Sequence, residues 1–274
     1  MAVTINDIAK LRKLTGAGMM DCKHALEETD NNIEAAIEVI RAKGKAVAAK
    51  RSDREASEGC VLCKVDGTFA AMIALKCETD FVAKNQDFIK LTQDILDLAV
   101  ANKCATLDEV KQLMLGGVTV EQAVIDRSGI TGEKMELDGY ITLEGENISI
   151  YNHQNKNMLC TMVALSKPVG ESYGHGVAMQ IAAMNPVSIS EKDVPEDIRA
   201  KEFEIAKEKT REEGKPENMI ERIAQGRMQK FYKESCLLNQ DYIMDPTKTV
   251  AAFLKEGDKE CTVSAFRRFT LRSE

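Results

Sequence analysis

Histidine is scarce in this sequence of 274 residues, tryptophan is absent, and no long apolar run occurs. A helix that crosses a membrane needs about 18 or more consecutive apolar residues, and no stretch supplies them. The first residues, Met1–Asp7, lack the basic start and apolar continuation of a signal peptide. We therefore expect a protein of the cytoplasm that has no membrane partner.

Motifs of the common enzyme classes are also absent. The sequence has no G-x-x-x-x-G-K-[ST] phosphate loop, no H-E-x-x-H zinc motif and no G-x-S-x-G nucleophile motif. The three histidines have simpler explanations. His24 faces solvent on a predicted helix, His175 begins another helix, and His153 lies in the polar tip of a predicted hairpin. Together these absences favour a protein that acts by binding rather than an enzyme.

The charge is acidic overall. A net charge of -7 and an isoelectric point near 5.3 argue against bulk binding of nucleic acid, because neutralising phosphates needs a basic face. We expect no direct nucleic-acid partner.

Eight cysteines in such a chain are expected to be reduced thiols. Cys60 and Cys63 form a C-x-x-C pair, a spacing found in zinc and redox sites. No second pair and no histidine pair completes a set of four ligands. Residues 60–65 have a strand pattern, in which positions three apart point to opposite faces. A thiol- or metal-dependent enzyme is therefore the main alternative class, and we expect neither a metal nor a cofactor.

Residues 1–54 are predicted to form a module of three helices and a linker. Apolar residues recur at helical spacing over 4–14, 20–28 and 31–42. The polar, partly basic stretch 43–58 is either a linker or a continuation of the third helix. A unit this small has little room for an enclosed site, so a binding face is expected rather than a catalytic pocket.

Met19 and Met20 follow a glycine turn in this module, with Arg12 at the same end of the first helix. Large apolar side chains are usually buried, so residue type favours the core for both methionines. The alternative is an adaptable apolar contact surface, a use for which methionine is well suited.

A hairpin followed by a helix is predicted twice, over 60–101 and over 147–184. Asp66-Gly67 suits the turn of the first hairpin. This pattern indicates an α+β core of two related subdomains, 55–139 and 140–274.

The second subdomain contains a strongly charged stretch at 191–222. The break Gly214-Lys215-Pro216 separates two helical patterns, so an antiparallel helical hairpin is predicted as an insertion at about 191–232. A solvated arm and a partner-binding arm are equally compatible with this composition. A short C-terminal segment follows, and a strand at 261–271 completes the subdomain.

The stretch 75–85, from Leu75 to Asn85, passes from an apolar strand into a helix. Thr79 and Asp80 are both able to cap the first free N–H groups of that helix. On residue type alone, Asp80 is the cap and Phe81 is a core residue, since most aromatic side chains are buried.

Two stretches closely resemble the hallmark motifs of the bacterial translation elongation factor Ts family: LRKLTGAGMMDCKHAL at 11–26 and CETDFVAK at 77–84. The resemblance extends to GRMQKF at 226–231 and MDPTKTV at 244–250. It implies an N-terminal module similar to ubiquitin-associated domains, a two-subdomain core and an inserted antiparallel coiled-coil hairpin. Where the family usually has an acid and an asparagine before the cysteine of the second motif, this chain has Ala74 and Lys76.

The resemblance also implies a function and a partner. Members of the family bind elongation factor Tu in its GDP form, disturb its magnesium and phosphate site, and promote GDP release during translation elongation. The implied contacts are with the nucleotide-binding domain and the third domain of elongation factor Tu. A homodimer or a heterotetramer is compatible with this.

The family's contact positions match individual residues here. Arg12, Met19 and Met20 match positions that pack on a helix of the GTPase domain. The segment that disturbs the magnesium ion matches Thr79, Asp80, Phe81 and Val82, and this match implies that Phe81 is left exposed for the partner. His153 matches a contact to the third domain of elongation factor Tu, and Arg51 lies near a basic partner contact.

Overall fold

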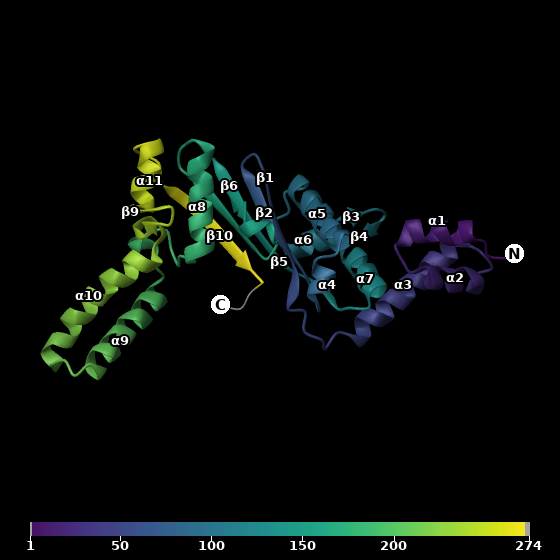
Figure 1. Cartoon of the computed structure of the whole chain (residues 1–274), viewed down its shortest axis with the longest axis horizontal. Helices are drawn as coiled ribbons and strands as arrows, with labels where there is room; N and C mark the ends of the chain where they lie inside the picture. The colour runs from purple at the N-terminus through teal and green to yellow at the C-terminus, as the bar shows by residue number, and fades with distance from the viewer. Residues whose placement is uncertain (1, 272–274) are drawn as a thin grey trace. The chain divides into compact units, whose positions relative to one another are not determined.

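Helices and small sheets alternate along residues 2–271, the part of the chain that the computed structural model describes (Figure 1). Met1 and residues 272–274, the ends of the predicted terminal domains, lie outside the described residues. The chain divides into two units. The first takes in the chain up to Leu62, Ala71–Ile141 and the stretch from Leu271, and the second takes in Cys63–Ala70 and Thr142–Thr270. The predicted α+β class is confirmed.

The first unit begins with three helices, α1 (Ile5–Thr15), α2 (Met19–Glu28) and α3 (Ile33–Lys50). Thr4 and Asp7 form a capping box at the start of α1, and Gly16 ends it in the left-handed region that glycine adopts without strain. The three predicted helices are confirmed. Of the two alternatives for the stretch 43–58, a continued helix is observed as far as Lys50, and residues 51–57 form a non-helical connection.

Their apolar stripes meet in a small core that contains Leu11, Leu26 and Ala36. Helix α3 then crosses α7 (Val120–Thr131) at two glycines. A Cβ atom added to Gly129 would lie 2.3 Å from the Cα atom of Gly44, so the two backbones are in direct contact.

One sheet has the order β1-β2-β5, with β1 (Glu58–Asp66), β2 (Phe69–Cys77) and β5 (Met135–Glu144), and most of its residues belong to the first unit. The predicted Asp66-Gly67 turn is confirmed, and Gly67 has a φ of 61°. Shorter elements follow β2: α4 (Asp80–Ala83), α5 (Gln86–Ala101), α6 (Leu107–Gln112), β3 (Met114–Leu115) and β4 (Val118–Thr119). Helix α5 buries one full face, including Phe88, Ile95 and Leu96.

The second unit has the sheet order β10-β7-β6, with β6 (Ile148–Asn152), β7 (Leu159–Leu165) and β10 (Val263–Thr270), all antiparallel. Helix α8 (Glu171–Met184) covers one face, as Figure 1 shows. Its residues Val177, Ala178 and Ile181 share a core with Val163 and Leu165 of β7. The other elements here are β8 (Asp241–Tyr242), β9 (Asp245–Thr249) and α11 (Val250–Gly257).

Helices α9 (Glu196–Glu212) and α10 (Glu217–Ser235) lie side by side and are joined at Gly214, which has a φ of 71° (Figure 1). Among the described residues, no helix is long and apolar enough to cross a membrane. One local prediction is wrong. His175 does not begin its helix, because α8 starts at Glu171.

The α3–α7 crossing generates a stability prediction. Gly129→Ala places a methyl group against backbone, which cannot move aside as a flexible side chain would. We expect a loss of about 1–3 kcal/mol in the free energy of unfolding, measured in urea. Gly226→Ala is the matched control, because it lies within helix α10 with nothing within 4 Å of an added Cβ atom. The control should leave stability unchanged or raise it by about 0.5–1 kcal/mol. Equal effects of the two changes would contradict the close crossing.

Candidate partner-binding site

The one-turn helix α4 carries the most exposed large apolar side chain of the described residues. Phe81 is 85% exposed. The expectation of a core aromatic at this position is therefore wrong, because the short helix turns residue 81 away from the protein, while Ala83 faces the interior. An exposed phenylalanine on an ordered turn is an apolar group held ready for contact.

Thr79 caps this helix. The amide of Val82 donates a hydrogen bond to its Oγ1 atom, at 3.4 Å. The expectation that Asp80 is the cap is wrong. Asp80 lies in the first turn instead, where its carboxylate accepts a 2.6 Å hydrogen bond from the Nζ atom of Lys84. This hydrogen bond lowers the pKa of Asp80, so the group is a carboxylate at neutral pH.

The carboxylate of Glu133 holds the residues before the helix. Its Oε2 atom accepts hydrogen bonds from the amides of Glu78 and Thr79, at 3.2 and 3.1 Å. Its Oε1 atom accepts a hydrogen bond from the hydroxyl of Thr79, at 2.6 Å. Because the hydroxyl hydrogen of Thr79 is directed at Glu133, the oxygen presents a lone pair to the amide of Val82. One carboxylate therefore orients both the strand end and the helix cap.

A second carboxylate reinforces this arrangement from the other side. Glu78 accepts hydrogen bonds from Arg51, at 2.9 and 3.1 Å to its two oxygens, and from the amide of Lys134 at 2.6 Å. Glu78 is largely buried, while the Arg51 side chain is 38% exposed. Arg51, which the resemblance places near a partner contact, thus also connects the chain after α3 to the base of the α4 turn.

Lys76 and Ala74 are the two positions that depart from the family pattern. Lys76 forms an ion pair with Asp138 of the neighbouring strand β5. Ala74 is fully buried in β2. The charge of Lys76 is therefore matched by a carboxylate of the neighbouring strand.

The N-terminal helices present a second exposed face. Met19 and Met20 are 53% and 59% exposed, so the expectation of two core methionines is wrong. The start of α2 directs them outward because Cys22, Ala25 and Leu26 take the buried positions. Arg12 is exposed on α1. An open groove of about 400 Å³ runs between Arg12 and Met19, bordered also by Ile5, Ile8, Ala9 and Lys13.

His153 lies in the second unit, in the short turn between β6 and β7. Its ring packs edge-on against Tyr151, whose hydroxyl lies 3.4 Å from the His153 Nδ1 atom. The ring is half-buried. The predicted position at the tip of the second hairpin is confirmed, and Tyr151 holds the imidazole in place there.

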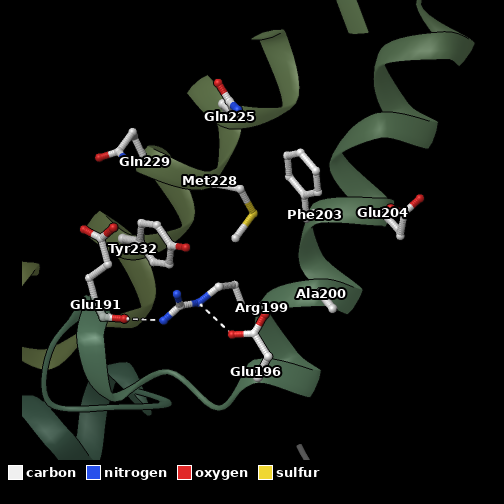
Figure 2. A pocket seen from close by; sticks show the side chains of 10 residues that line it. All are labelled: Glu191, Glu196, Arg199, Ala200, Phe203, Glu204, Gln225, Met228, Gln229 and Tyr232. Carbon is white, nitrogen blue, oxygen red and sulfur yellow. Dashed lines mark hydrogen bonds and ion pairs between the residues drawn. The ribbon is translucent and has the colours of Figure 1, made fainter. Parts of the chain in front are cut away.

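The helical arm has an apolar seam and an open groove of about 550 Å³ between α9 and α10 (Figure 2). Phe203 and Met228 face each other across it, with Tyr232 further along α10. Arg199 donates a 3.1 Å hydrogen bond to the carbonyl of Glu191 and lies 3.7 Å from the carboxylate of Glu196. The two alternatives for this arm, solvation and partner binding, both stay predictions.

The two C-x-x-C cysteines have different surroundings. Cys60 is fully buried, whereas Cys63 is partly exposed. Across residues 2–271, no group of three or more histidine, cysteine, aspartate or glutamate side chains is placed to hold a metal ion.

These features define a class: a protein that presents ordered, exposed apolar side chains for contact with another macromolecule. The comparisons with known proteins identify the family. A family model described as elongation factor TS matches residues 78–273. Proteins named elongation factor Ts from Phocaeicola vulgatus and Bacteroides fragilis are 53% identical to this chain, and one from Porphyromonas gingivalis is 52% identical. In each case the alignment covers the whole of both chains. The chain belongs to the elongation factor Ts family.

Glu133 and Glu78 are residues of the site that sequence reasoning missed. Glu78 lies within the second family motif, so its position beside Thr79 and Asp80 could have indicated that it belongs to the site. Glu133 lies far along the chain from that motif, and nothing in the local sequence around it indicates which backbone groups it binds.

The exposure of Phe81 generates a prediction about stability. Phe81→Ala should change the free energy of unfolding by no more than about 0.5 kcal/mol, because the ring makes little contact with the protein. Phe88→Ala is the comparison, since Phe88 is fully buried in α5. That change should cost about 3–5 kcal/mol. Urea unfolding followed by circular dichroism measures both, and a loss at Phe81 near that at Phe88 would restore the core interpretation.

Proposed function

We propose that this chain is a nucleotide-exchange factor for elongation factor Tu, acting in the cytoplasm during translation elongation. Membership of the elongation factor Ts family supports the role. The observation that carries it is Phe81, an exposed aromatic on a turn held by two carboxylates. In this proposal the chain catalyses no chemical reaction itself and needs no cofactor.

The α4 turn acts as a wedge, which we define as Thr79, Asp80, Phe81 and Val82. It enters beside the nucleotide site of elongation factor Tu and disturbs the magnesium ion and the GDP phosphates. The Phe81 ring gains apolar contact there that it lacks in the free protein. Asp80 brings a carboxylate near a site that otherwise favours anionic phosphate, and like charges disfavour GDP.

Exchange requires that the factor bind the nucleotide-free partner more tightly than the GDP-bound partner, because equal affinity shifts no equilibrium. A thousandfold weakening of GDP corresponds to about 4 kcal/mol of such preference. The coupling is reciprocal, so nucleotide that binds again expels the factor with the same free energy. A rigid wedge suits this task. A turn that changed its conformation on contact would bind the GDP-bound and the nucleotide-free partner about equally well, and so would not favour GDP release.

Other contacts hold the partner while the wedge acts. Arg12, Met19 and Met20 pack on the nucleotide-binding domain of elongation factor Tu, where the flexible methionines adapt to its surface. His153 contacts the third domain. Arg51 supports the wedge through Glu78 and keeps enough exposed surface for the partner contact that the family resemblance implies.

We also propose the predicted domain organisation for this function. The module and linker at 1–54, similar to ubiquitin-associated domains, carry the methionine face. The core subdomain 55–139 carries the wedge. The core subdomain 140–274 carries His153 and the coiled-coil insertion at about 191–232. A homodimer or a heterotetramer with elongation factor Tu is compatible with these contacts.

Release of a fluorescent GDP analogue from elongation factor Tu, followed by stopped flow, tests the function. The chain should accelerate release strongly. Phe81→Ala should slow the accelerated rate about tenfold to a hundredfold, since burial of a phenylalanine is worth about 1.5–3 kcal/mol and 1.4 kcal/mol is a factor of ten. Met114→Ala is the matched control, because Met114 is 61% exposed in the same unit and outside the proposed contacts.

A chain that binds elongation factor Tu without accelerating release would be a passive adaptor and would overturn the proposal. Zinc-dependent release, or release lost on changing Cys60 and Cys63, would favour the enzyme class instead. Equal slowing by Phe81→Ala and Met114→Ala would remove the wedge from the mechanism.

The support of the wedge by Glu133 gives a separate prediction. Glu133→Ala leaves two amides and one hydroxyl without their acceptor, each worth about 0.5–1.5 kcal/mol. The maximal release rate at saturating factor should fall about tenfold, with a smaller change in the concentration needed for half-saturation. Glu133→Gln keeps two acceptor lone pairs and should restore part of the rate.

The matched control for this prediction is Glu136→Ala, because Glu136 lies close by in the sequence, in strand β5, and its exposed carboxylate pairs with Lys134 at 3.5 Å. It should leave the release rate unchanged. A Glu133→Ala variant that loses affinity but keeps its maximal rate would show that Glu133 does not position the wedge.

A further inference from the structure

The guanidinium of Arg127 lies against the chain that follows the wedge. Arg127 belongs to helix α7, and its side chain is 13% exposed. Its Nη2 atom donates a 3.1 Å hydrogen bond to the Oδ1 atom of Asn85 and lies 3.2 Å from the carboxylate of Asp87. Arg127 and Asn85 are 42 positions apart in the sequence, so this contact is a product of the tertiary fold.

Asn85 is the residue at which the wedge is joined to helix α5. Its amide donates a 3.0 Å hydrogen bond to the carbonyl of Val82, the last residue of the wedge. Its Oδ1 atom also accepts the amide of Asp87 at 2.9 Å, and this bond caps α5. Because the same oxygen accepts from Arg127, the guanidinium fixes the orientation of the Asn85 side chain and, through it, the turn between α4 and α5.

The wedge is thus held at both ends by helix α7 and the turn after it. Glu133 accepts hydrogen bonds from the amides of Glu78 and Thr79, where the chain enters the wedge. Arg127 donates where the chain leaves it. The hydroxyl of Ser128, the residue after Arg127, donates a 2.5 Å hydrogen bond to the carbonyl of Glu133. One short piece of chain therefore carries both the carboxylate and the guanidinium.

Arg127 also reaches the N-terminal helices. A Cβ atom added to Gly16 would lie 3.9 Å from the Nη1 atom of Arg127 and 3.4 Å from the Cδ1 atom of Ile130. Gly16 ends helix α1 and stands three residues before Met19. The same guanidinium therefore lies between the segment that leads into the exposed methionines and the segment that leaves the wedge.

Stability alone does not account for this placement. The Nε atom of Arg127 is buried and has no hydrogen-bond partner among residues 2–271, whereas buried polar groups are normally paired. Its carboxylate partner Asp87 is 77% exposed, and ion pairs in contact with solvent contribute little to folding. The main interaction of this largely buried charge is the charge-assisted hydrogen bond to Asn85.

We propose that Arg127 is a positioning residue for nucleotide exchange, which acts through Asn85 to hold the end of the wedge. A one-turn helix that is attached only at its start can still rotate about that attachment. The second attachment removes this freedom, so Phe81 keeps its direction when the wedge meets its partner. This inference rests on the proposed function and adds to it a residue outside the motifs of the family resemblance.

Release of the fluorescent GDP analogue from elongation factor Tu, measured against the concentration of the full chain, tests the role. Arg127→Ala should lower the maximal release rate about tenfold, as expected for the loss of one charge-assisted hydrogen bond, and should change the half-saturating concentration less than about twofold. Arg127→Lys keeps the charge and a donor and should recover part of the rate. Arg41→Ala is the matched control, because Arg41 lies 3.7 Å from the carboxylate of Asp126, the residue before Arg127. The control should keep the full rate.

Asn85→Ser tests the same contact from the other side. Serine is a good helix cap, so α5 should keep its start, but the serine hydroxyl is too short to take the place of the Asn85 amide oxygen. This variant should reproduce the slow maximal rate of Arg127→Ala. The double variant should be no slower than either single variant, because both changes remove one interaction.

Three results would overturn the positioning role. They are a full maximal rate in Arg127→Ala, an equal loss in Arg41→Ala, and losses that multiply in the double variant with Asn85→Ser. A variant that loses affinity but keeps its maximal rate would also contradict it. Circular dichroism shows which variants are folded, and Asn85→Ser decides the question if Arg127→Ala is not. A wild-type chain that does not accelerate release contradicts the proposed function itself.

Discussion

The contact on which the site depends is that of Glu133 with the end of strand β2. A strand that stops in solvent leaves its last amides without acceptors, and a one-turn helix is too short to be stable by itself. One carboxylate meets both needs by accepting from Glu78, Thr79 and the cap hydroxyl. Phe81 can remain exposed because the backbone beneath it is fixed by hydrogen bonds rather than by its own burial.

This arrangement separates the two functions that an aromatic side chain usually combines. A buried phenylalanine stabilises the protein by its burial, whereas the Phe81 ring is 85% exposed and packs little against the rest of the chain. The same separation holds at α2, where Cys22 and Leu26 form the core and Met19 and Met20 remain outside. Both exposed groups lie in the first turn of a helix, within two residues of its N-cap.

Much of the fold could be predicted from the sequence, because helical and strand periodicity and the Gly and Pro breaks are local signals. The three N-terminal helices, the Asp66-Gly67 hairpin and the break at 214–216 are examples. Less of the candidate site could be predicted from the sequence. The exposure of Phe81 contradicts the average behaviour of its residue type, and the family resemblance, not the residue pattern, indicated it. Glu133 could not be found, since the amides and the hydroxyl that donate hydrogen bonds to its carboxylate come near it only in the folded chain.

The direct contact of Gly44 with Gly129 has a consequence for the order of folding. Helices α1 to α3 are close in sequence, so they can form early and at little entropic cost. The crossing with α7 joins segments that are separated by the whole β1–β2 hairpin and α5. We expect this crossing to form only after the intervening chain has become compact. A shift of either helix along the other would bring a side chain against the backbone, so the two glycines fix the register of the contact. We therefore expect the N-terminal module to acquire this attachment late, after the β1–β2 hairpin, α4 and α5 have formed.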